Sequence, residues 1–353
     1  MVKKLLAVLL TVLTMCGVFA VGVSAAPVDI TTDFHDVNFR AAVYELIGKT
    51  SPAPIYDTDV AYITDLDVRN KSITSLSGLR NFVGLKSLNC SDNQLTELPS
   101  LPSGLEALSC ESNQLILLPT LPSGLQGLEC GNNRLRSLPA VLPASIWYLG
   151  CSYNQLRSLP ALPASLVKLF CGKNQLTSMP KLPSSLLELY CDYNQLTSLP
   201  ALPNSLRLLQ CLKNQLTSMP KLPSSLIGLV CNDNQLTTLD VTGAPLLGLL
   251  WCYNNNMPNK SAVIGFKGSW EADWDGTWDE EEGIDALFVF GPQNRVTPPT
   301  TKPTTPPTTK PTTPPTTKPT QPTKPIEPTE PSFFAKIWNF IVRWILFGWL
   351  WQK

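Results

Sequence analysis

The sequence predicts a β-rich solenoid, a superhelix with a parallel sheet on its concave face and an extended, polyproline-like convex side. Nine of the ten cysteines recur at intervals of 20 or 21 residues. A leucine stands two residues before each of these nine, and an asparagine stands three residues after each. Paired prolines in the connecting segments exclude a regular helix there. Such a fixed period is typical of stacked units rather than of a conventional globular core.

The repeated frame is L-x-x-L-x-C-x-x-N-x-L, the leucine-rich repeat pattern with cysteine in one apolar position. Alternate side chains of a strand point to opposite faces, so the leucine and the cysteine of L-x-C both point inward. The asparagine amide both donates and accepts, and therefore suits the backbone bend that follows the strand. The nine cysteines are Cys90, Cys110, Cys130, Cys151, Cys171, Cys191, Cys211, Cys231 and Cys252.

A tenth unit without cysteine precedes these nine. Val68 takes the place of the cysteine and Lys71 that of the asparagine. Irregular units are expected beside a capping segment. The apolar positions of this unit are Ile63, Leu66, Val68, Ile73 and Leu76.

With L-P-x-L-P-x-S-L between its strands, the array over residues 63–257 resembles the short bacterial class of leucine-rich repeats, familiar from YopM-type and IpaH-type effectors. The segment from Phe34 to Val68 resembles the N-terminal cap of internalin-like bacterial surface proteins. Both resemblances imply a protein-binding scaffold. A secretion signal and the lack of a ligase-like domain after the repeats favour a surface protein over an injected ligase.

Charge and histidine content exclude several functions. Lys plus Arg and Asp plus Glu each number 27, so the net charge is zero, which argues against a general nucleic-acid binder. His35 is the single histidine, so histidine-based catalysis and metal sites are not expected. We expect no enzymatic activity, no catalytic residue and a monomer.

The termini predict export and attachment to the cell envelope. Lys3 and Lys4 precede an apolar run and the small residues before Ala26, the order of a secretory signal peptide cleaved after Ala25. The predicted parts are a signal peptide (1–25), an N-terminal cap (26–62), leucine-rich repeats (63–257), an acidic C-terminal cap (258–296), a Thr/Pro-rich stalk (297–331) and a membrane-seeking tail (332–353).

The stalk and the tail define how the repeats are presented. Residues 297–331 hold 13 prolines and 14 threonines, a composition that predicts a semi-rigid spacer without a core. In the tail, polar residues spaced by four, three and four form one narrow stripe on a helix, which favours an amphipathic anchor lying in the membrane interface. A membrane-spanning helix and an envelope sorting signal are the alternatives. The stripe consists of Ser332, Lys336, Asn339 and Arg343.

Outward residues of the strands are the candidate ligand-binding positions, because packing dictates the inward ones. Exposed aromatic side chains are enriched at protein-binding hot spots. A protein ligand on the concave face is therefore expected, and the alternative is a glycan-binding or structural protein of the cell envelope. Two of the candidates, Trp251 and Tyr253, have a second interpretation, which is packing against the C-terminal cap. The candidates are Tyr148, Tyr153, Phe170, Tyr190, Tyr193, Trp251 and Tyr253.

An acidic stretch in the C-terminal cap matches the spacing of a calcium-binding loop, with Gly276 at its sixth position. A solvated acidic loop is the alternative, because flanking glycines are poor material for supporting helices. The tryptophans at 270, 274 and 278 also suggest carbohydrate binding. Apart from calcium no cofactor is expected, and its candidate ligands are Glu271, Asp273, Asp275, Asp279 and Glu282.

The cysteine column has three interpretations. Stacked thiols in an apolar position behave as small buried hydrophobic residues, which is the interpretation we favour. Disulfides between neighbouring repeats are disfavoured, because parallel Cβ vectors suit the bridge dihedral badly and an odd number leaves one thiol over. Binding of a soft metal is the third.

Overall fold

The computed structural model describes residues 26–268, 272–273, 288–291 and 293. The chain divides into one unit over Met1–Pro298 and another over Pro299–Lys353, and every described residue belongs to the first. The predicted signal peptide, stalk and tail lie outside the described residues. Within the described ranges, no helix has the length and apolar character needed to cross a bilayer.

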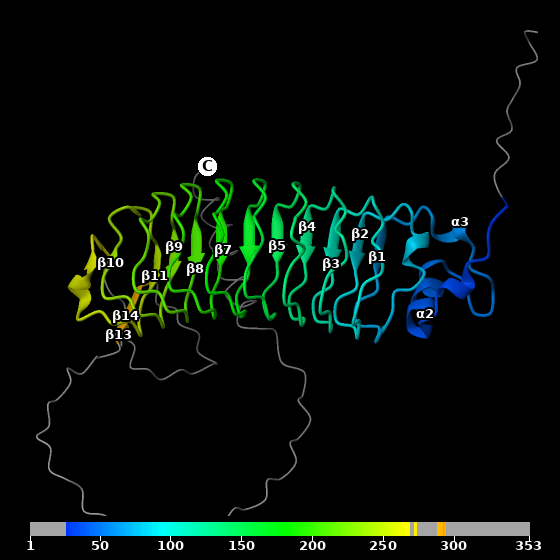
Figure 1. Cartoon of the computed structure of the whole chain (residues 1–353), viewed down its shortest axis with the longest axis horizontal. Coiled ribbons are helices and arrows are strands. Elements are labelled where there is room, and N and C mark those ends of the chain that lie inside the picture. The colour runs from blue at the N-terminus through cyan, green and yellow to red at the C-terminus, as the bar shows by residue number, and fades with distance from the viewer. Residues whose placement is uncertain (1–25, 269–271, 274–287, 292, 294–353) are drawn as a thin grey trace, which may run out of the picture. The chain divides into compact units, whose positions relative to one another are not determined.

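A small helical cap precedes the repeats. It contains η1 (Thr31–Asp33), α2 (Val37–Leu46) and α3 (Asp57–Val60), which lie beside β1 (Asp65–Asp67) (Figure 1). The carboxylate of Asp36 starts α2 by accepting from the backbone N–H groups of Asn38 and Phe39, both at 2.9 Å.

Three phenylalanine rings join the cap to the first repeat. Phe34 and Phe39 of the cap have ring centroids 5.6 Å apart. The Phe34 ring also lies 6.3 Å from the Phe82 ring, which follows η2 (Leu79–Asn81) between the first two strands. All three side chains are fully buried, so the cap covers the otherwise open end of the apolar column.

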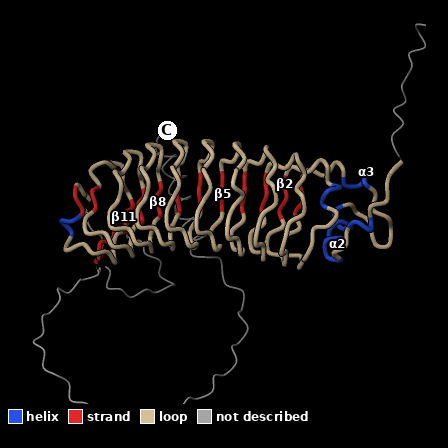
Figure 2. Tube along the Cα trace, in the orientation of Figure 1, coloured by secondary structure: helices blue, strands red, loops and turns tan. Residues whose placement is uncertain are grey.

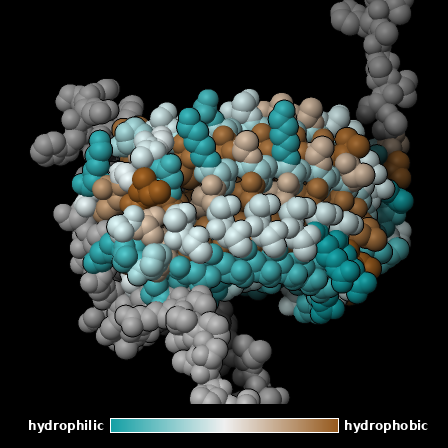
Figure 3. Space-filling view, turned by 60° about the vertical axis from the view of Figure 1, so that its left-hand side comes forward, coloured by the Kyte–Doolittle hydropathy of each residue, from teal (hydrophilic) through white to brown (hydrophobic). Residues whose placement is uncertain are grey.

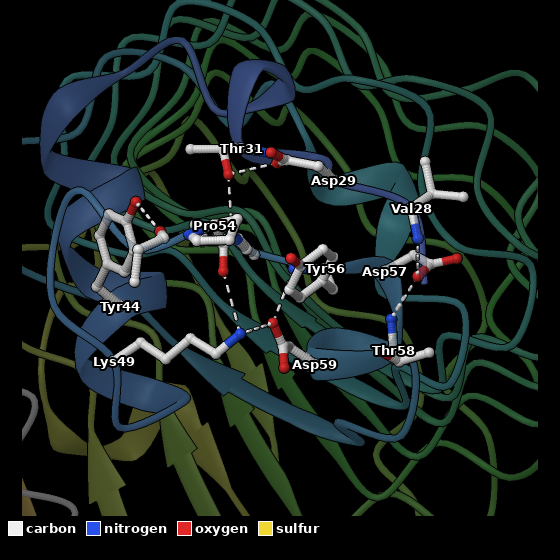
Figure 4. Close-up of polar contacts among 12 residues, drawn as sticks. Val28, Asp29, Thr31, Tyr44, Lys49, Pro54, Tyr56, Asp57, Thr58 and Asp59 are labelled. Atoms are coloured by element: carbon white, nitrogen blue, oxygen red, sulfur yellow. Dashed lines mark hydrogen bonds and ion pairs between the residues drawn. The ribbon is translucent and has the colours of Figure 1, made fainter. Parts of the chain in front are cut away.

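Polar contacts close the loop of the cap between α2 and α3 (Figure 4). The Lys49 ammonium donates to the Pro54 carbonyl at 3.0 Å and is paired with Asp59. The backbone N–H of Ile55 donates to the Thr31 hydroxyl at 2.8 Å. The cap is therefore tied together by hydrogen bonds as well as by its aromatic core.

The repeats form one sheet of twelve strands, in the order β1 to β9, then β11, β14 and β13 (Figures 1 and 2). Each neighbouring pair is parallel, and from β1 to β11 the central leucine of each strand faces the central leucine of the next. The predicted parallel-sheet solenoid is confirmed. These strands are β2 (Ser87–Asn89), β3 (Ala107–Ser109), β4 (Gly127–Glu129), β5 (Tyr148–Gly150), β6 (Lys168–Phe170), β7 (Glu188–Tyr190), β8 (Leu208–Gln210), β9 (Gly228–Val230) and β11 (Leu249–Trp251).

At the C-terminal end of the array, additional strands form two kinds of pairing. β10 (Leu239–Asp240) pairs with β12 (Val263–Ile264), just after η3 (Lys260–Ala262), in a separate two-stranded sheet. β14 (Phe288–Gly291) joins β11, and β13 (Ala272–Asp273) joins β14.

The core is a continuous column of leucine and cysteine side chains, with every repeat cysteine 0% exposed. The tenth unit follows the same plan, because Leu66, Val68, Ile73 and Leu76 are buried. The segment from β2 to β11, all of which the structure describes, contains no helix, so the proline-rich side is thin as predicted. On the face in Figure 3, side chains of like hydropathy form rows along the solenoid.

The asparagine of each repeat holds the bend after the strand. The Asn154 amide donates to the carbonyls of Cys130 at 3.0 Å and of Cys151 and Ser152 at 3.2 Å. Its oxygen accepts from the backbone N–H of Leu135 at 2.9 Å. One side chain therefore satisfies buried backbone groups of two consecutive repeats.

We expect Asn154→Ala to lower the free energy of unfolding by about 2–3 kcal/mol, because buried backbone groups lose their partners. The adjacent Gln155 is exposed and serves as control, since Gln155→Ala removes an amide without a buried role. Urea unfolding followed by circular dichroism measures both. Equal midpoints for the two variants would contradict the structural role of the asparagine.

Candidate functional site

The outward strand residues lie on the side of the sheet that faces away from the leucine core, which is the predicted concave face. Core packing does not dictate the identity of these residues. In β6 the central Leu169 is buried, whereas Lys168 and Phe170 on either side are only partly buried. The same alternation recurs in β2, β3 and β4, whereas in β5, β7, β8, β9 and β11 one outward residue is also buried, among them Tyr190 at 8% exposed. Outward residues of neighbouring strands stand side by side at the strand spacing of about 4.8 Å.

Three of the predicted aromatic residues form one stack across β5, β6 and β7. The ring of Phe170 lies 5.6 Å from that of Tyr148 and 4.6 Å from that of Tyr190. Phe170 and Tyr190 are registered partners in the sheet, and their rings are inclined by only 18°. The structure thus brings Tyr148, Phe170 and Tyr190 together, and we call them the aromatic stack.

A carboxylate lies at one end of this stack. The Tyr148 hydroxyl donates to Oε2 of Glu129 at 2.5 Å, and the Gly131 N–H donates to Oε1 at 3.3 Å. The Glu129 carboxylate fills the space beside Gly150, where a Cβ would meet Oε2 at 2.0 Å. Burial raises the pKa of Glu129, although the Tyr148 hydrogen bond lowers it in part. Burial and the nearby Glu129 charge raise the pKa of Tyr148.

A second buried carboxylate, Asp192, belongs to the repeat of Tyr190. Asp192 is 2% exposed, and its Oδ1 lies 2.6 Å from where a Gly172 Cβ would stand. Burial raises the pKa of Asp192 from 3.8 to about 6, although the charge of Lys173 lowers it in part. Gly172, in the preceding repeat, therefore makes room for this carboxylate, as Gly150 in the following repeat does for Glu129.

Two predicted tyrosines stand in a separate row at the turn after the strands. This row, the tyrosine–lysine row, consists of Tyr153, Lys173, Tyr193 and Lys213, all with φ between 49° and 56°. The Lys173 ammonium lies 4.3 Å from the centroid of the Tyr153 ring and 5.0 Å from that of Tyr193, and Lys213 lies 4.8 Å from the latter. The two tyrosines are 41% and 37% exposed. Cation–π contacts therefore order the most accessible predicted aromatics.

Trp251 and Tyr253 lie apart from these residues, at the end of the array. They form a small apolar cluster with Val289 of β14, and they are 9% and 7% exposed. Packing against the segment that follows the repeats is one of the two interpretations that the sequence allowed. A role for this pair in ligand binding stays a prediction.

The predicted calcium ligands Glu271, Asp275, Asp279 and Glu282 lie outside the described residues, as do the tryptophans at 270, 274 and 278. Asp273 belongs to β13. Among the described residues, no group of three or more acidic, histidine or cysteine side chains could hold a metal ion. The calcium loop and its carbohydrate-binding alternative stay predictions.

The nine repeat cysteines are free thiols buried in the core, in agreement with the favoured interpretation. Burial raises the pKa of Cys90 and Cys252 to about 12 and that of Cys171 well above its ordinary value. The Cys130 thiol donates to the Gly150 carbonyl at 3.3 Å, across to the next repeat. The column is therefore protonated and unreactive in the folded protein.

Sequence reasoning did not single out Asp192 or the pairing of Glu129 with Tyr148. A signal existed, since each carboxylate has a glycine at or near the equivalent position of an adjacent repeat, Gly172 for Asp192 and Gly150 for Glu129. A glycine amid larger outward residues indicates that a neighbouring side chain lies over it.

The comparisons with known proteins support this architecture. InlJ from Listeria monocytogenes, whose functional domain includes a cysteine ladder, matches at a TM-score of 0.58 and 27% identity over 66% of this chain and 58% of that one. YopM from Yersinia enterocolitica matches at 0.49 and 34% over 55% and 47%. The chain thus spans about half the length of each structure. No protein-family model and no curated protein matches the sequence. The repeat array is a leucine-rich repeat solenoid of the bacterial type.

Asp192→Asn should stabilise the fold near neutral pH. Because the folded pKa of about 6 exceeds the ordinary 3.8, the ionised carboxylate destabilises the folded state as pH rises through this interval. We expect the variant to be about 1–3 kcal/mol more stable at about pH 8 and nearly unchanged at about pH 4.

Urea unfolding at the two pH values measures this difference. Asp92→Asn is the matched control, because Asp92 also follows a strand of the sheet but is exposed. A gain for Asp192→Asn that is the same at both pH values would contradict a buried, ionised carboxylate.

Proposed function

We propose that this chain is an exported cell-surface protein that binds a protein partner through the concave face of its sheet, without catalysis, in adhesion or recognition. The observation that carries the proposal is the aromatic stack on β5 to β7, with rings 4.6 and 5.6 Å apart. Stacked aromatic side chains offer a large contact area at a small cost in rotamer entropy.

Charged groups beside the stack supply specificity. Lys168 and Glu188 form an ion pair of 2.9 Å beside the rings, and Glu129 accepts from the Tyr148 hydroxyl at 2.5 Å. Charges at the rim of an apolar centre are the usual anatomy of a protein interface, since they fix register and reject wrong partners.

The tyrosine–lysine row supports the same proposal. Its side chains are ordered by mutual contact before any partner arrives, which reduces the entropy lost on binding. Tyr153 and Tyr193 belong to the same repeats as Tyr148 and Tyr190, so both sets of aromatics belong to one short part of the array.

The absence of a catalytic role is supported by where the titratable groups stand. The single histidine, His35, lies in the N-terminal cap, where its backbone N–H donates to the Ser77 hydroxyl at 3.0 Å, whereas the aromatic stack lies on β5 to β7. The cysteine thiols are buried and held protonated, so they are unsuited to act as nucleophiles.

Phe170→Ala combined with Tyr190→Ala should lose partner binding while the melting temperature stays within a few degrees, because both rings stand outside the leucine core. The test immobilises the full chain, exposes it to surface-protein extracts of neighbouring or host cells, and quantifies each captured protein against the double variant. Tyr62→Ala is the matched control, because Tyr62 is a 74% exposed aromatic of the cap.

A second variant guards against misfolding. Tyr153→Asn with Tyr193→Asn removes the exposed rings at positions of positive φ, and asparagine occupies that conformation at Asn132 and Asn254. Unchanged capture by both double variants refutes the assignment. A glycan array probed in parallel would favour the glycan-binding alternative if only sugars bind in a ring-dependent manner.

Deletion of residues 332–353 should release the protein from cells into the medium, because the tail is the proposed membrane anchor. Fractionation and immunoblotting of cells and medium measure the release. The control is a variant that lacks eight residues of the stalk (297–331) but keeps the tail. This variant should stay with the cells. Retention of the tail deletion would overturn the anchor.

A further inference from the structure

The repeats serve as their own reference for the turn that follows each strand. From the repeat of Cys171 to that of Cys211 this turn reads N-Q-L-T-S, and the repeats of Cys90 and Cys231 differ from it at one residue each. Three consecutive repeats depart further, with N-Q-L-I-L, N-R-L-R-S and N-Q-L-R-S. The departures introduce two apolar residues followed by three arginines, Ile116, Leu117, Arg134, Arg136 and Arg157, which we call the turn patch.

These three turns lie directly beside one another. The backbone N–H of Arg134 donates to the Leu115 carbonyl at 2.9 Å, and that of Gln155 donates to the Leu135 carbonyl at 2.9 Å. The turn of each repeat is therefore hydrogen-bonded to the turn of the next. Adjacent members of the patch are separated by about one strand spacing, 4.8 Å.

The members of the patch face solvent and add nothing to the core. Leu115, Leu135 and Leu156 are fully buried, whereas their flanking residues in the patch are exposed. Ile116 and Leu117 are 59% and 57% exposed, unusual for two consecutive aliphatic side chains.

The arginines have no counter-charge in the part of the chain that the structure describes. None of the ion pairs there involves Arg134, Arg136 or Arg157. At the matching turn positions of the other repeats the one carboxylate is Glu97, which lies two repeats before Arg136. Within the described residues, these three guanidinium groups form no ion pair, and Ile116 and Leu117 do not belong to the core.

We propose that the turn patch is a second docking surface, for a protein segment that carries several carboxylates beside an apolar side chain. Guanidinium groups bind carboxylates through paired hydrogen bonds, which provides the attraction and the register. Ile116 and Leu117 supply the apolar contact. A polyanion such as a phosphate polymer would use the arginines alone, so the apolar pair distinguishes the two classes of partner.

The turn patch is separate from the aromatic stack. If the turn patch binds no such segment, the proposed function of the aromatic stack is unaffected. The proposal also uses no residue outside the described range. Its test therefore compares two sets of variants on the same full chain, one for the charges and one for the apolar pair.

Restoring the ordinary repeat residues provides conservative variants. Arg134→Gln, Arg136→Thr and Arg157→Thr together remove the charges, and Ile116→Thr with Leu117→Ser removes the apolar pair. Replacement of Lys181, Lys221 and Lys267 by alanine is the charge-matched control, because these lysines are exposed and lie elsewhere. All variants are first compared by thermal unfolding.

The probes are a fluorescent random copolymer of glutamate and tyrosine, poly-glutamate and inorganic polyphosphate, measured by fluorescence anisotropy. We expect the copolymer to bind more tightly than poly-glutamate. The arginine variant should weaken copolymer binding about tenfold or more, and the apolar variant should reduce it to the level of poly-glutamate. The lysine control should change it less than twofold.

Three results would overturn the proposal. One is the absence of copolymer binding to the unaltered chain. Another is an equal loss in the lysine control, which would indicate attraction by net charge alone. The third is polyphosphate binding that depends on the arginines while copolymer binding ignores the apolar pair, which would make the patch a site for polyanions.

Discussion

The hydrogen bonds of the repeated asparagine are the interaction on which the whole structure depends. Each repeat must reverse direction after three strand residues, and a bend in a core-facing position leaves buried carbonyls and N–H groups. Asn174, like Asn154, donates to the carbonyls of its own and the preceding repeat and accepts from the Leu156 N–H of that repeat. The side chain thus fixes the bend and couples one turn of the solenoid to the next. Leucines and cysteines then pack in a register that these bonds impose.

A backbone specified in this way leaves the outward positions free to vary. The thin proline-rich side needs only serine hydroxyls, such as Ser165, which donates to the Ala144 and Ile146 carbonyls at 2.7 and 2.6 Å. Residues of the sheet face and the turns can therefore vary without changing the leucine and cysteine core. The aromatic stack, the tyrosine–lysine row and the turn patch all belong to the central repeats of the array. Because each repeat contacts only its neighbours, these residues, which are close in sequence, are also close in space.

Two glycines provide the space that the buried carboxylates of the sheet face occupy. Gly150 and Gly172 have no side chain to exclude the carboxylates of Glu129 and Asp192. These groups are consequently desolvated, which raises the pKa of both. Such carboxylates interact strongly with a cationic or hydrogen-bonding group that a partner presents, because the surrounding dielectric is low. The folded chain loses some stability near neutral pH in exchange for this surface.

The sequence by itself determined the period, the inward residues and the cysteine-free first unit. It did so because each of these depends on a local pattern repeated about ten times. It also predicted which columns face outward and hence the aromatic candidates. Tertiary structure decided what those residues contact. Trp251 and Tyr253 pack against Val289, 38 and 36 residues later in the chain, and Phe170 stacks on Tyr190 through strand register. The burial of Asp192 depends on the space left by Gly172 one repeat earlier, so the pattern within a single repeat does not reveal it and only a comparison between repeats gives a signal.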